Sequence, residues 1–250
     1  MSLEHYDPWN DISLQEEVMK KYMQQESVLL RFRSRLYWLV KRAVWKFVVW
    51  FTHFIKRVLD MGGSLCAMLL LSPVFLFTWI AIKIEDPGPS FYVQQRVGKW
   101  GQLFSMYKFR SMVMHADKIK DTLLDQNESA KGVIFKMKED PRITRTGKWI
   151  RKLSIDELPQ LLNVLKGEMS LVGPRPAVPS EVAEYNQHDR KRLDVIPGIT
   201  CLWQVGGRSD IDFEGQVRLD VQYIREQSFI SDLVILLKTI PAVLLGKGAY

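Results

Sequence analysis

The sequence predicts an α+β protein that is mostly helical, in which a re-entrant membrane helix leads into a cytosolic domain with a small β-hairpin and interfacial amphipathic helices. Three observations favour this class. A run of twenty-two uncharged residues, 61–82, is interrupted in its middle by Ser72-Pro73. Two strand patterns flank a glycine-containing turn after it. Much of the remaining chain shows leucines at helical spacing or polar stretches typical of surface helices.

The composition of the 250-residue chain limits its partners more than its fold. A formal net charge of +7 favours anionic partners, which are nucleic acid, phosphorylated substrates or an acidic membrane surface. Cys66 and Cys201 stand far apart and outside any CxxC pattern, so they define neither a disulfide framework nor a thiolate metal site. The histidines lack metal-ligand spacing, and the polar first thirty residues are not expected to form a cleavable signal peptide.

The first predicted region, residues 1–55, is a polar tail followed by a basic and aromatic helix. Between Arg31 and Arg57 the chain carries eight lysines and arginines and no acid, mixed with Trp, Phe, Val and Leu. This mixture is typical of an amphipathic helix at an anionic lipid surface. Nucleic-acid binding, or a basic helix packed on the domain, are the alternatives. The uncharged run that follows favours lipid.

Residues 56–83 are expected to enter the membrane and return to the same side. The uncharged residues 61–82 are long enough to cross a bilayer core, but proline within Ser72-Pro73 removes a backbone donor and bends a helix. Lysines and arginines flank the run on both sides, and the positive-inside rule places both flanks in the cytoplasm. A re-entrant helix satisfies both observations. A kinked span, with the larger part of the chain outside, is the alternative.

The third predicted region, residues 84–250, begins with the β-hairpin. Its strand patterns meet at a turn that contains Gly98 and Gly101. A polar helix is expected up to about Glu128, followed by a loop and a basic turn that end at Ser154.

Helical spacing returns after this turn. Leucines recur from Leu158 to Leu165, and Gly167 predicts the end of their helix. Residues 181–195 predict a polar helix and residues 197–210 a glycine-rich loop. The C-terminal part is predicted to be helical again, and a lysine and a proline interrupt its apolar stretch, which favours an interfacial or buried helix over a spanning one.

An acidic pair, Asp156 and Glu157, stands at the predicted start of the leucine helix. One interpretation is structural, because Ser154 and Glu157 have the spacing of a capping box. The other is chemical, because Arg151 precedes the pair and Arg175 follows in a Pro-Arg-Pro turn. A carboxylate can attack phosphorus, a divalent cation can bridge carboxylate and phosphates, and arginine fits phosphate oxygens as a planar fork. Both interpretations can hold at once.

Four segments carry a resemblance to a known family: KFRSM (108–112), DPRITRTGKWIRKLSIDELPQLLNVLKGEMSLVGPRP (140–176), RLDVIPGITCLWQVGGRS (192–209) and GKGAY (246–250). They resemble the monotopic phosphoglycosyl transferases, bacterial sugar transferases of glycoconjugate assembly. The segment KRVLDMGGSLCAMLLLSPVF is similar to the helix by which that family enters the membrane. The match covers residues 56–250, roughly four fifths of the chain.

The resemblance implies an enzyme that moves a sugar 1-phosphate from a UDP-sugar to undecaprenyl phosphate and releases UMP, with residues 84–250 as its cytosolic catalytic domain. This is a first membrane step of exopolysaccharide, capsule or O-antigen synthesis at the cytoplasmic face of the bacterial inner membrane. Asp156 is implied as the nucleophile of a double displacement that forms a phosphosugar intermediate. Glu157 is implied as its partner in acid–base or metal chemistry, and either acid could hold the implied cofactor, Mg²⁺.

Residue matches to the family extend this implied site. Four basic residues are implied to bind phosphates: Lys108, Arg110, Arg151 and Arg175. Two residues are implied in the nucleotide or sugar pocket: Gln204 and Arg208. Three are implied where the chain enters the membrane: Asp60, Ser72 and Pro73. The implied partners are UDP-sugar, undecaprenyl phosphate and inner-membrane lipids, with a homodimer allowed and no nucleic acid.

Two positions depart from the family pattern. Members usually have Gly where Cys201 stands, and Ser or Asn where Gly206 stands, so the shape of that loop and the sugar preference are in question. The GAY ending and the LWQV loop resemble the larger hexose-transferring members, which favours UDP-glucose or UDP-galactose. Two rival functions remain. One is a membrane-anchored protein that binds phosphorylated ligands without turnover, and the other is a single displacement in which Asp156 only holds metal.

Overall fold

The structure, a computed structural model, describes residues 16–17, 20–21, 28–116, 140–207 and 211–245. Residue contacts divide the chain into two units, Met1–Ile55 and Lys56–Tyr250. Most of the polar helix predicted up to Glu128 and the whole GKGAY segment lie outside the described residues.

A single helix, α2 (Val28–Leu70), forms over the basic and aromatic segment and continues into the second unit. Many of its apolar side chains between Phe32 and Ile55 are exposed. Lysine and aromatic side chains contact one another along it, as where Lys41 Nζ lies 5.0 Å from the centre of the Trp38 ring. Basic side chains mixed with exposed aromatic ones are the pattern of a helix at a lipid surface.

The predicted break at Ser72-Pro73 is confirmed. Helix α2 ends at Leu70 and α3 (Ser72–Glu85) begins two residues later, at an angle of 60°. Pro73 lies in the first turn of α3, where the backbone donor that proline lacks has no helical partner. Within the part of the chain that the structure describes, no helix alone has the length and apolar composition of a membrane span, whereas the bent pair meets both criteria together.

The predicted hairpin is also confirmed. Strand β1 (Phe91–Val97) pairs antiparallel with β2 (Leu103–Phe109), joined by the short 3-10 turn η1 (Lys99–Gly101). Trp100 in that turn has a φ of 57° and Gly101 a φ of 81°, which lets the chain reverse tightly. Side chains from β2 and from residues 164–169 form the core beneath the hairpin: Phe104, Met106, Val164 and Met169, with Leu171 and Ile199 against them.

The predicted basic turn before the acidic pair is wrong, because a helix, α5 (Arg145–Lys152), forms there. Thr144 caps it by accepting a hydrogen bond from Gly147 N at 2.9 Å. The Glu85 carboxylate accepts from its first two backbone amides, both at 2.7 Å. Ile150 packs on the buried side chains of α3 and β2. The helix depends on a distant acid and a distant core, which local composition does not reveal.

The leucine segment folds as two short helices, η3 (Ile155–Gln160) and α6 (Leu161–Lys166). Gly167 ends α6 with a φ of 90°, as predicted. Asn163, fully buried, ties α6 to β2 because its side-chain oxygen accepts from Tyr107 N and its amide donates to Ser105 O. The elements that carry the acidic pair are therefore fixed to the hairpin.

The predicted glycine-rich loop at 197–210 is wrong over most of its length. Strand β4 (Gly198–Thr200) pairs parallel with β3 (Ser170–Val172), and α8 (Leu202–Gly206) follows. The strand that pairs with β4 lies almost thirty residues earlier in the chain, so the sequence around β4 gives no sign of the pairing. The glycines and the proline of residues 197–210 therefore predicted a loop.

The predicted polar helix at 181–195 is also wrong, because two short helices, α7 (Pro179–Ala183) and η4 (Asp189–Asp194), form instead. Asn186 separates them. Its side-chain oxygen accepts from His188 N at 2.7 Å and Asp189 N at 3.0 Å, a local turn that competes with a continuous helix.

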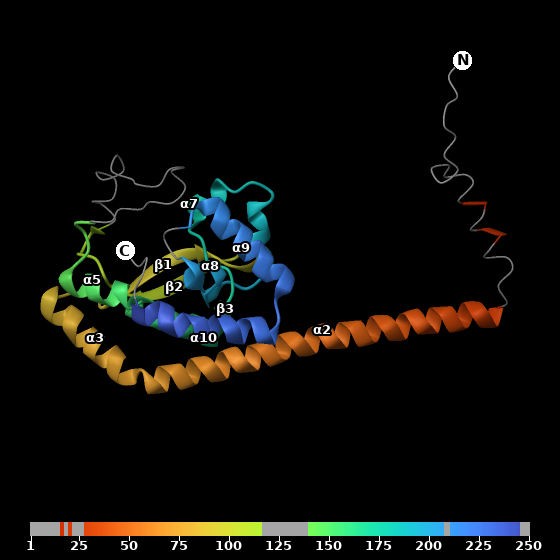
Figure 1. Ribbon diagram of the computed structural model, residues 1–250, viewed down its shortest axis with the longest axis horizontal. Coiled ribbons are helices and arrows are strands. Elements are labelled where there is room, and N and C mark those ends of the chain that lie inside the picture. Colours follow the sequence, from red (N-terminus) through yellow and green to blue (C-terminus); the bar gives the residue numbers. More distant parts are fainter. Residues whose placement is uncertain (1–15, 18–19, 22–27, 117–139, 208–210, 246–250) are drawn as a thin grey trace, which may run out of the picture. The chain divides into compact units, whose positions relative to one another are not determined.

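The C-terminal part is helical as predicted, with α9 (Phe213–Glu226) and α10 (Phe229–Leu245). Lys238 and Pro241, which interrupt the apolar stretch of the sequence, both lie within α10, because one missing donor does not prevent the neighbouring residues from staying helical. One side of α10 is buried through Ile235 against Val172 and Tyr223. Figure 1 shows α10 running beneath the β1–β2 hairpin in that view.

The other side of α10 is apolar and exposed. Its exposed large side chains are Phe229, Ile230, Leu233, Val234, Leu237, Ile240 and Leu244. An apolar face of this size is typical of a surface that meets lipid or another protein.

Candidate active site

A cavity of about 750 Å³ brings together residues from the hairpin, η3, α8, α10 and the turn after β3. Seven of the eight residues that the sequence assigns to catalysis or substrate binding line it: Lys108, Arg110, Arg151, Asp156, Glu157, Arg175 and Gln204. The eighth, Arg208, lies outside the described residues. Basic side chains outnumber acids in the described lining, so the cavity suits an anionic ligand.

The 3-10 helix η3 places both acids on the cavity wall. Ser154, the residue before it, has a φ of 53°, a left-handed conformation that is uncommon for a residue with a side chain. In this conformation Ser154 makes no side-chain cap bond. The predicted capping box is therefore wrong, and the carboxylate of Glu157 bonds to basic side chains from other elements instead.

Glu157 is held by two cations. Arg175 Nη2 donates to Glu157 Oε1 at 2.5 Å and Nη1 donates to Oε2 at 3.2 Å, while Lys108 Nζ lies 3.1 Å from Oε1. Burial alone would raise the pKa of Glu157, but Arg175 and Lys108 outweigh it and lower that pKa. Burial lowers the pKa of Lys108, against the opposing effect of Glu157. Glu157 is thus ionised and fully engaged near neutral pH.

Asp156 has the opposite environment. It is buried, and within the described residues it makes no hydrogen bond or ion pair. Burial raises its pKa to about 6, Lys108 acts in the opposite direction, and the neighbouring charge of Glu157 adds to the rise. Two adjacent carboxyls with pKa values pushed apart are a common sign of separate chemical roles.

The turn that carries Arg175 is held on both sides. Gly173 N donates to Thr200 O at 3.0 Å and Gly198 N donates to Pro174 O at 2.9 Å. The two glycine backbones touch so closely that a Cβ on Gly198 would lie 2.0 Å from Gly173 N. Only glycine allows this contact, which fixes the backbone just before Arg175.

Arg96 also lines the cavity, and the sequence reasoning missed it. Its guanidinium donates to Gln94 Oε1 at 2.7 Å and to Pro176 O at 2.9 Å, and it makes no ion pair with any described residue. Burial and the nearby Arg175 lower its pKa to about 10. Strand alternation could have found it, because Tyr92, Gln94 and Arg96 share one face of β1 and all three line the cavity.

The remaining predicted cations differ in their partners. Arg110 is buried and committed to the segment after α3, where it contacts the carbonyl and the carboxylate of Asp86. Arg151 is the next to last residue of α5 and makes no ion pair with any described residue. Gln204, in α8, accepts a hydrogen bond from the Cys201 thiol at 3.2 Å. Burial, with a smaller effect of Asp220, raises the pKa of that thiol well above its usual value.

The chemistry of the two acids can be compared with the needs of Mg²⁺. The described residues hold no group of three or more His, Cys, Asp and Glu side chains placed to bind a metal. Mg²⁺ commonly uses one or two carboxylates and takes its other ligands from phosphates and water. Asp156, buried without a cation partner, fits that role better than Glu157, whose oxygens already face Lys108 and Arg175.

The three residues implied at the membrane segment do not line the cavity. Asp60 is buried and its Oδ1 accepts from Leu171 N at 3.0 Å. Ser72 Oγ donates to Leu69 O at 2.8 Å, within the break between α2 and α3. Pro73 lies in the first turn of α3.

Comparison with known proteins identifies the family of this chain. A family model described as bacterial sugar transferase matches residues 51–246. The galactosyl transferase CpsE of Streptococcus agalactiae is 50% identical over 80% of this chain and 44% of its own length. The undecaprenyl-phosphate galactose phosphotransferase of Salmonella typhimurium is 42% identical over 90% of this chain and 45% of its own.

A shorter relative is matched almost throughout. The exopolysaccharide production protein ExoY of Rhizobium meliloti is 43% identical over 78% of this chain and 88% of its own length. The chain thus spans less than half of the two longer relatives and most of the shorter one. By the extent of the family match, this chain belongs to the bacterial sugar transferase family.

Proposed function

We propose that this chain transfers a hexose 1-phosphate from a UDP-sugar to undecaprenyl phosphate, releasing UMP and forming undecaprenyl-diphosphate-sugar. One observation carries the proposal. A desolvated carboxyl without a cation partner, Asp156, adjoins a carboxylate that holds Lys108 and Arg175 in a cationic cavity. The names of two relatives, a galactosyl transferase and an undecaprenyl-phosphate galactose phosphotransferase, favour galactose and the lipid phosphate acceptor.

The first displacement starts at Asp156. One of its carboxylate oxygens attacks the sugar-bearing phosphorus, a new P–O bond forms, and the bond from that phosphorus to the bridging oxygen breaks. UMP leaves with the electron pair, and the sugar phosphate stays on Asp156 as an acyl-phosphate. A carboxylate whose pKa is about 6 is a stronger base than an ordinary aspartate and is still mostly ionised above pH 7.

The second displacement regenerates the enzyme. A phosphate oxygen of undecaprenyl phosphate attacks the same phosphorus, the bond to Asp156 breaks, and the carboxylate is released. The product holds the diphosphate linkage, so atoms and charge balance over the two steps. In a single displacement the UDP-sugar and undecaprenyl phosphate would have to be bound at the same time. The cations of the cavity would then have to offset the negative charge of both molecules.

Glu157 acts by holding cations rather than by moving protons. Its lowered pKa makes it a poor proton carrier near neutral pH. Its bidentate bond instead orients the Arg175 fork and places Lys108 beside it, so both are ready to stabilise negative charge on the phosphates. Arg96 adds a third cation on the β1 side. Mg²⁺, if held by Asp156 and the donor phosphates, would supply further charge neutralisation.

We also propose that the bent pair α2–α3 is a re-entrant membrane segment, with the cavity at the cytoplasmic face of the bacterial inner membrane. The supporting observations are the 60° break, the basic flanks on both sides of the apolar run, and the exposed apolar face of α10. This arrangement would keep the cavity within reach of a lipid phosphate.

The decisive experiment omits the lipid acceptor. The full chain is incubated with UDP-galactose, UDP-glucose and other UDP-sugars in turn, with Mg²⁺, and UMP release and intact protein mass are followed together. We expect a single-turnover release of UMP and an added hexose phosphate on Asp156, both lost in Asp156→Asn. UMP release that requires undecaprenyl phosphate, without any adduct, would favour the single displacement. No UMP from any donor, with or without acceptor, would favour a binding protein.

A further inference from the structure

Three polar side chains within five residues of α2 reach the backbone of two segments that carry the proposed site. They are Lys56, Arg57 and Asp60, here called the α2 anchor. Lys56 and Asp60 contact β3, which leads to Arg175, and Arg57 contacts the end of α6, which follows Glu157. None of the three lines the cavity, so any effect on the reaction has to pass through the segments they hold.

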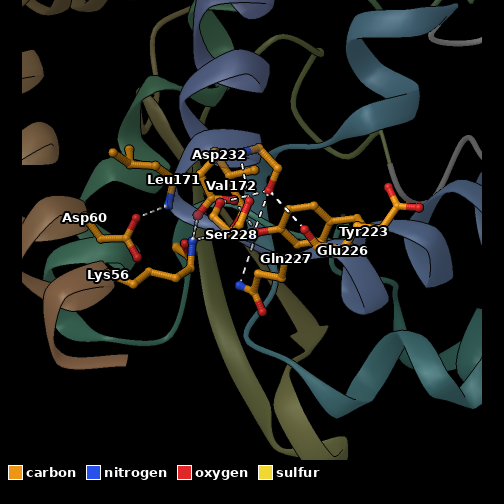
Figure 2. Close-up of polar contacts among 11 residues, drawn as sticks. Lys56, Asp60, Leu171, Val172, Tyr223, Glu226, Gln227, Ser228 and Asp232 are labelled. Atoms are coloured by element: carbon orange, nitrogen blue, oxygen red, sulfur yellow. Dashed lines mark hydrogen bonds and ion pairs between the residues drawn. The ribbon is translucent and has the colours of Figure 1, made fainter. Parts of the chain in front are cut away.

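The first arm of the anchor holds β3, as Figure 2 shows. Asp60 Oδ1 accepts from Leu171 N at 3.0 Å, and Lys56 Nζ donates to the next carbonyl, Val172 O, at 3.3 Å. Within the described residues β3 pairs only with β4, so the anchor supplies contacts to β3 that no other strand provides. A Cβ on Gly63, one turn further along α2, would lie 2.9 Å from Leu171 Cδ1, so helix and strand are in close contact.

A buried tyrosine shows why Lys56 is needed there. Tyr223 Oη lies 2.7 Å from Asp232 Oδ1 and 3.0 Å from Val172 O, but it has one proton to donate. The carboxylate is the stronger acceptor, so Val172 O depends on Lys56 and on Ser170 Oγ at 3.0 Å. Lys56 also pairs with Asp232 Oδ2 at 2.5 Å, which joins α2, β3 and α10 at one point (Figure 2).

The second arm holds α6. Arg57 donates through Nη1 to Val164 O and through Nη2 to Leu165 O, the latter at 2.8 Å. These carbonyls belong to the last turn of α6, where Val164 O also accepts from Gly167 N at 3.0 Å and a cation meets the negative end of the helix dipole. Because η3 runs directly into α6, holding this turn also holds the segment that carries Glu157.

The two arms end on either side of one ion pair. Arg175 follows Val172 by three residues, and its bond to Glu157 is the contact that orients the cations of the cavity. We propose that the α2 anchor consists of positioning residues, which set the separation of the Glu157-bearing and Arg175-bearing segments so that Arg175 can stabilise phosphate charge in the transition state. The effect on turnover, here the catalytic part, rests on the proposed transferase function. The holding of β3 and α6 by the anchor, here the mechanical part, does not depend on that function. The anchor would make the first residues of the membrane segment part of the catalytic framework.

The mechanical part is tested by hydrogen exchange on the full chain in lipid nanodiscs, with two variants that serve as controls for each other. Asp60→Ala removes the acceptor of the Leu171 N–H on β3, and Arg57→Met keeps an unbranched stem but removes the donors to α6. In Asp60→Ala we expect amide exchange over residues 171–175 to rise about 10-fold or more, with residues 161–167 unchanged. Arg57→Met should give the reverse pattern.

The catalytic part is tested by kinetics of UMP release. A displacement near 1 Å far from the chemistry can cost about 100-fold, so kcat should fall about 10- to 100-fold in Asp60→Ala with little change in KM for the UDP-sugar. Asp60→Asn, whose amide oxygen can still accept from Leu171 N, should recover most of that loss. Combined with Arg175→Lys, Asp60→Ala should cost clearly less than the product of the two single effects.

A stability control separates positioning from general weakening. Asp212→Ala removes the side chain that caps α9 by accepting from Gly215 N, at a position far from β3 and α6 in sequence. In the double variant with Arg175→Lys, the fold loss in kcat should equal the product of the two single losses. The proposal would be overturned if amide exchange in the variants increased equally over the whole Lys56–Tyr250 unit. It would also be overturned if the kcat losses of Asp60→Ala and Arg175→Lys were fully multiplicative. If the wild-type chain turns over no UDP-sugar, the proposed function fails, and the segment-specific exchange pattern alone decides whether the anchor positions the pair.

Discussion

Replacing Asp156 by Asn should change how the stability of the metal-free protein depends on pH. Burial holds the pKa of Asp156 at about 6 in the folded chain, against a usual value of 3.8 that applies after unfolding. Between these values the folded state binds more protons than the unfolded state, so stability falls as pH rises. Above about pH 6 the ionised carboxylate is a net cost to folding, and below about pH 4 that cost is absent.

The structure sets the size of this effect. The shift corresponds to about 2 pKa units, and each unit is worth about 1.4 kcal/mol, so the difference amounts to about 3 kcal/mol. The asparagine side chain of the variant would carry a fixed penalty for its buried amide, but that penalty does not depend on pH. The free energy of unfolding of Asp156→Asn relative to wild type should therefore increase by roughly 2 to 3 kcal/mol between pH 4 and pH 7.5, because a small part of the full effect already lies below pH 4.

The assay is denaturant unfolding of the full chain in detergent with a chelator, at pH 4, 5, 6 and 7.5. Adding Mg²⁺ at pH 7.5 should then stabilise the wild-type protein more than Asp156→Asn, because only the aspartate offers a charged ligand. A stability difference that stays constant across this pH range would refute the account of Asp156 as a desolvated carboxylate without a cation partner.

Asp220 provides the matched control. Burial also raises its pKa to about 6, against the effect of Arg192, whose Nε and Nη2 both lie 2.8 Å from Asp220 Oδ2. Asp220→Asn leaves a buried guanidinium without its counterion, so it should destabilise the protein by about 3–5 kcal/mol at neutral pH. At neutral pH Asp220→Asn should therefore cost more stability than Asp156→Asn, because only Asp220 has a buried guanidinium that the substitution leaves without a counterion.

Three further outcomes follow from the site and the bent helix pair. Arg175→Lys should lower kcat for UMP release by about 10- to 1000-fold, since a point charge cannot replace the bidentate fork, and near-normal turnover would place Arg175 outside the reacting centre. Arg96→Gln should raise KM for the UDP-sugar about 10-fold or more while Asp156 still forms the adduct, and an unchanged KM would remove Arg96 from the donor site. Single cysteines at positions 46 and 99 should both resist an impermeant thiol reagent in intact cells. Labelling at 99 alone would establish a span, and leucines in place of Ser72-Pro73 should convert part of the population to that form.

The parts of the fold that could be predicted are those with local signals. The break at Ser72-Pro73, the hairpin and the end of α6 at Gly167 each depend on a proline, a glycine or a short-range alternation. Strand β4 could not be predicted in the same way, because three residues become a strand only when β3 lies beside them. Helix α5 likewise depends on Glu85, sixty residues earlier in the chain.

In the candidate site too, residues with a local sequence signal could be predicted and contacts between distant segments could not. Family motifs identified Asp156, Glu157, Lys108 and Arg175, and the structure brings all four to one cavity. Their pairing was not predictable, because the local spacing favours a capping role for Glu157. Its actual partners lie 49 and 18 residues away in the chain, and the left-handed Ser154 rules out the cap. Arg96 was missed because a single cation in a strand has no motif of its own.

The contact between Gly173 and Gly198 has a consequence for biosynthesis. Chains are made from the N-terminus, and domains generally fold as their residues emerge. The backbone that precedes Arg175 gains its support only after residue 198 has left the ribosome, and Lys56 meets Asp232 later still. The bent pair α2–α3 is complete more than a hundred residues before either event. If α2–α3 is the membrane segment proposed above, a chain released between these points would carry that segment without the assembled cavity, and translation would place membrane docking before phosphate binding.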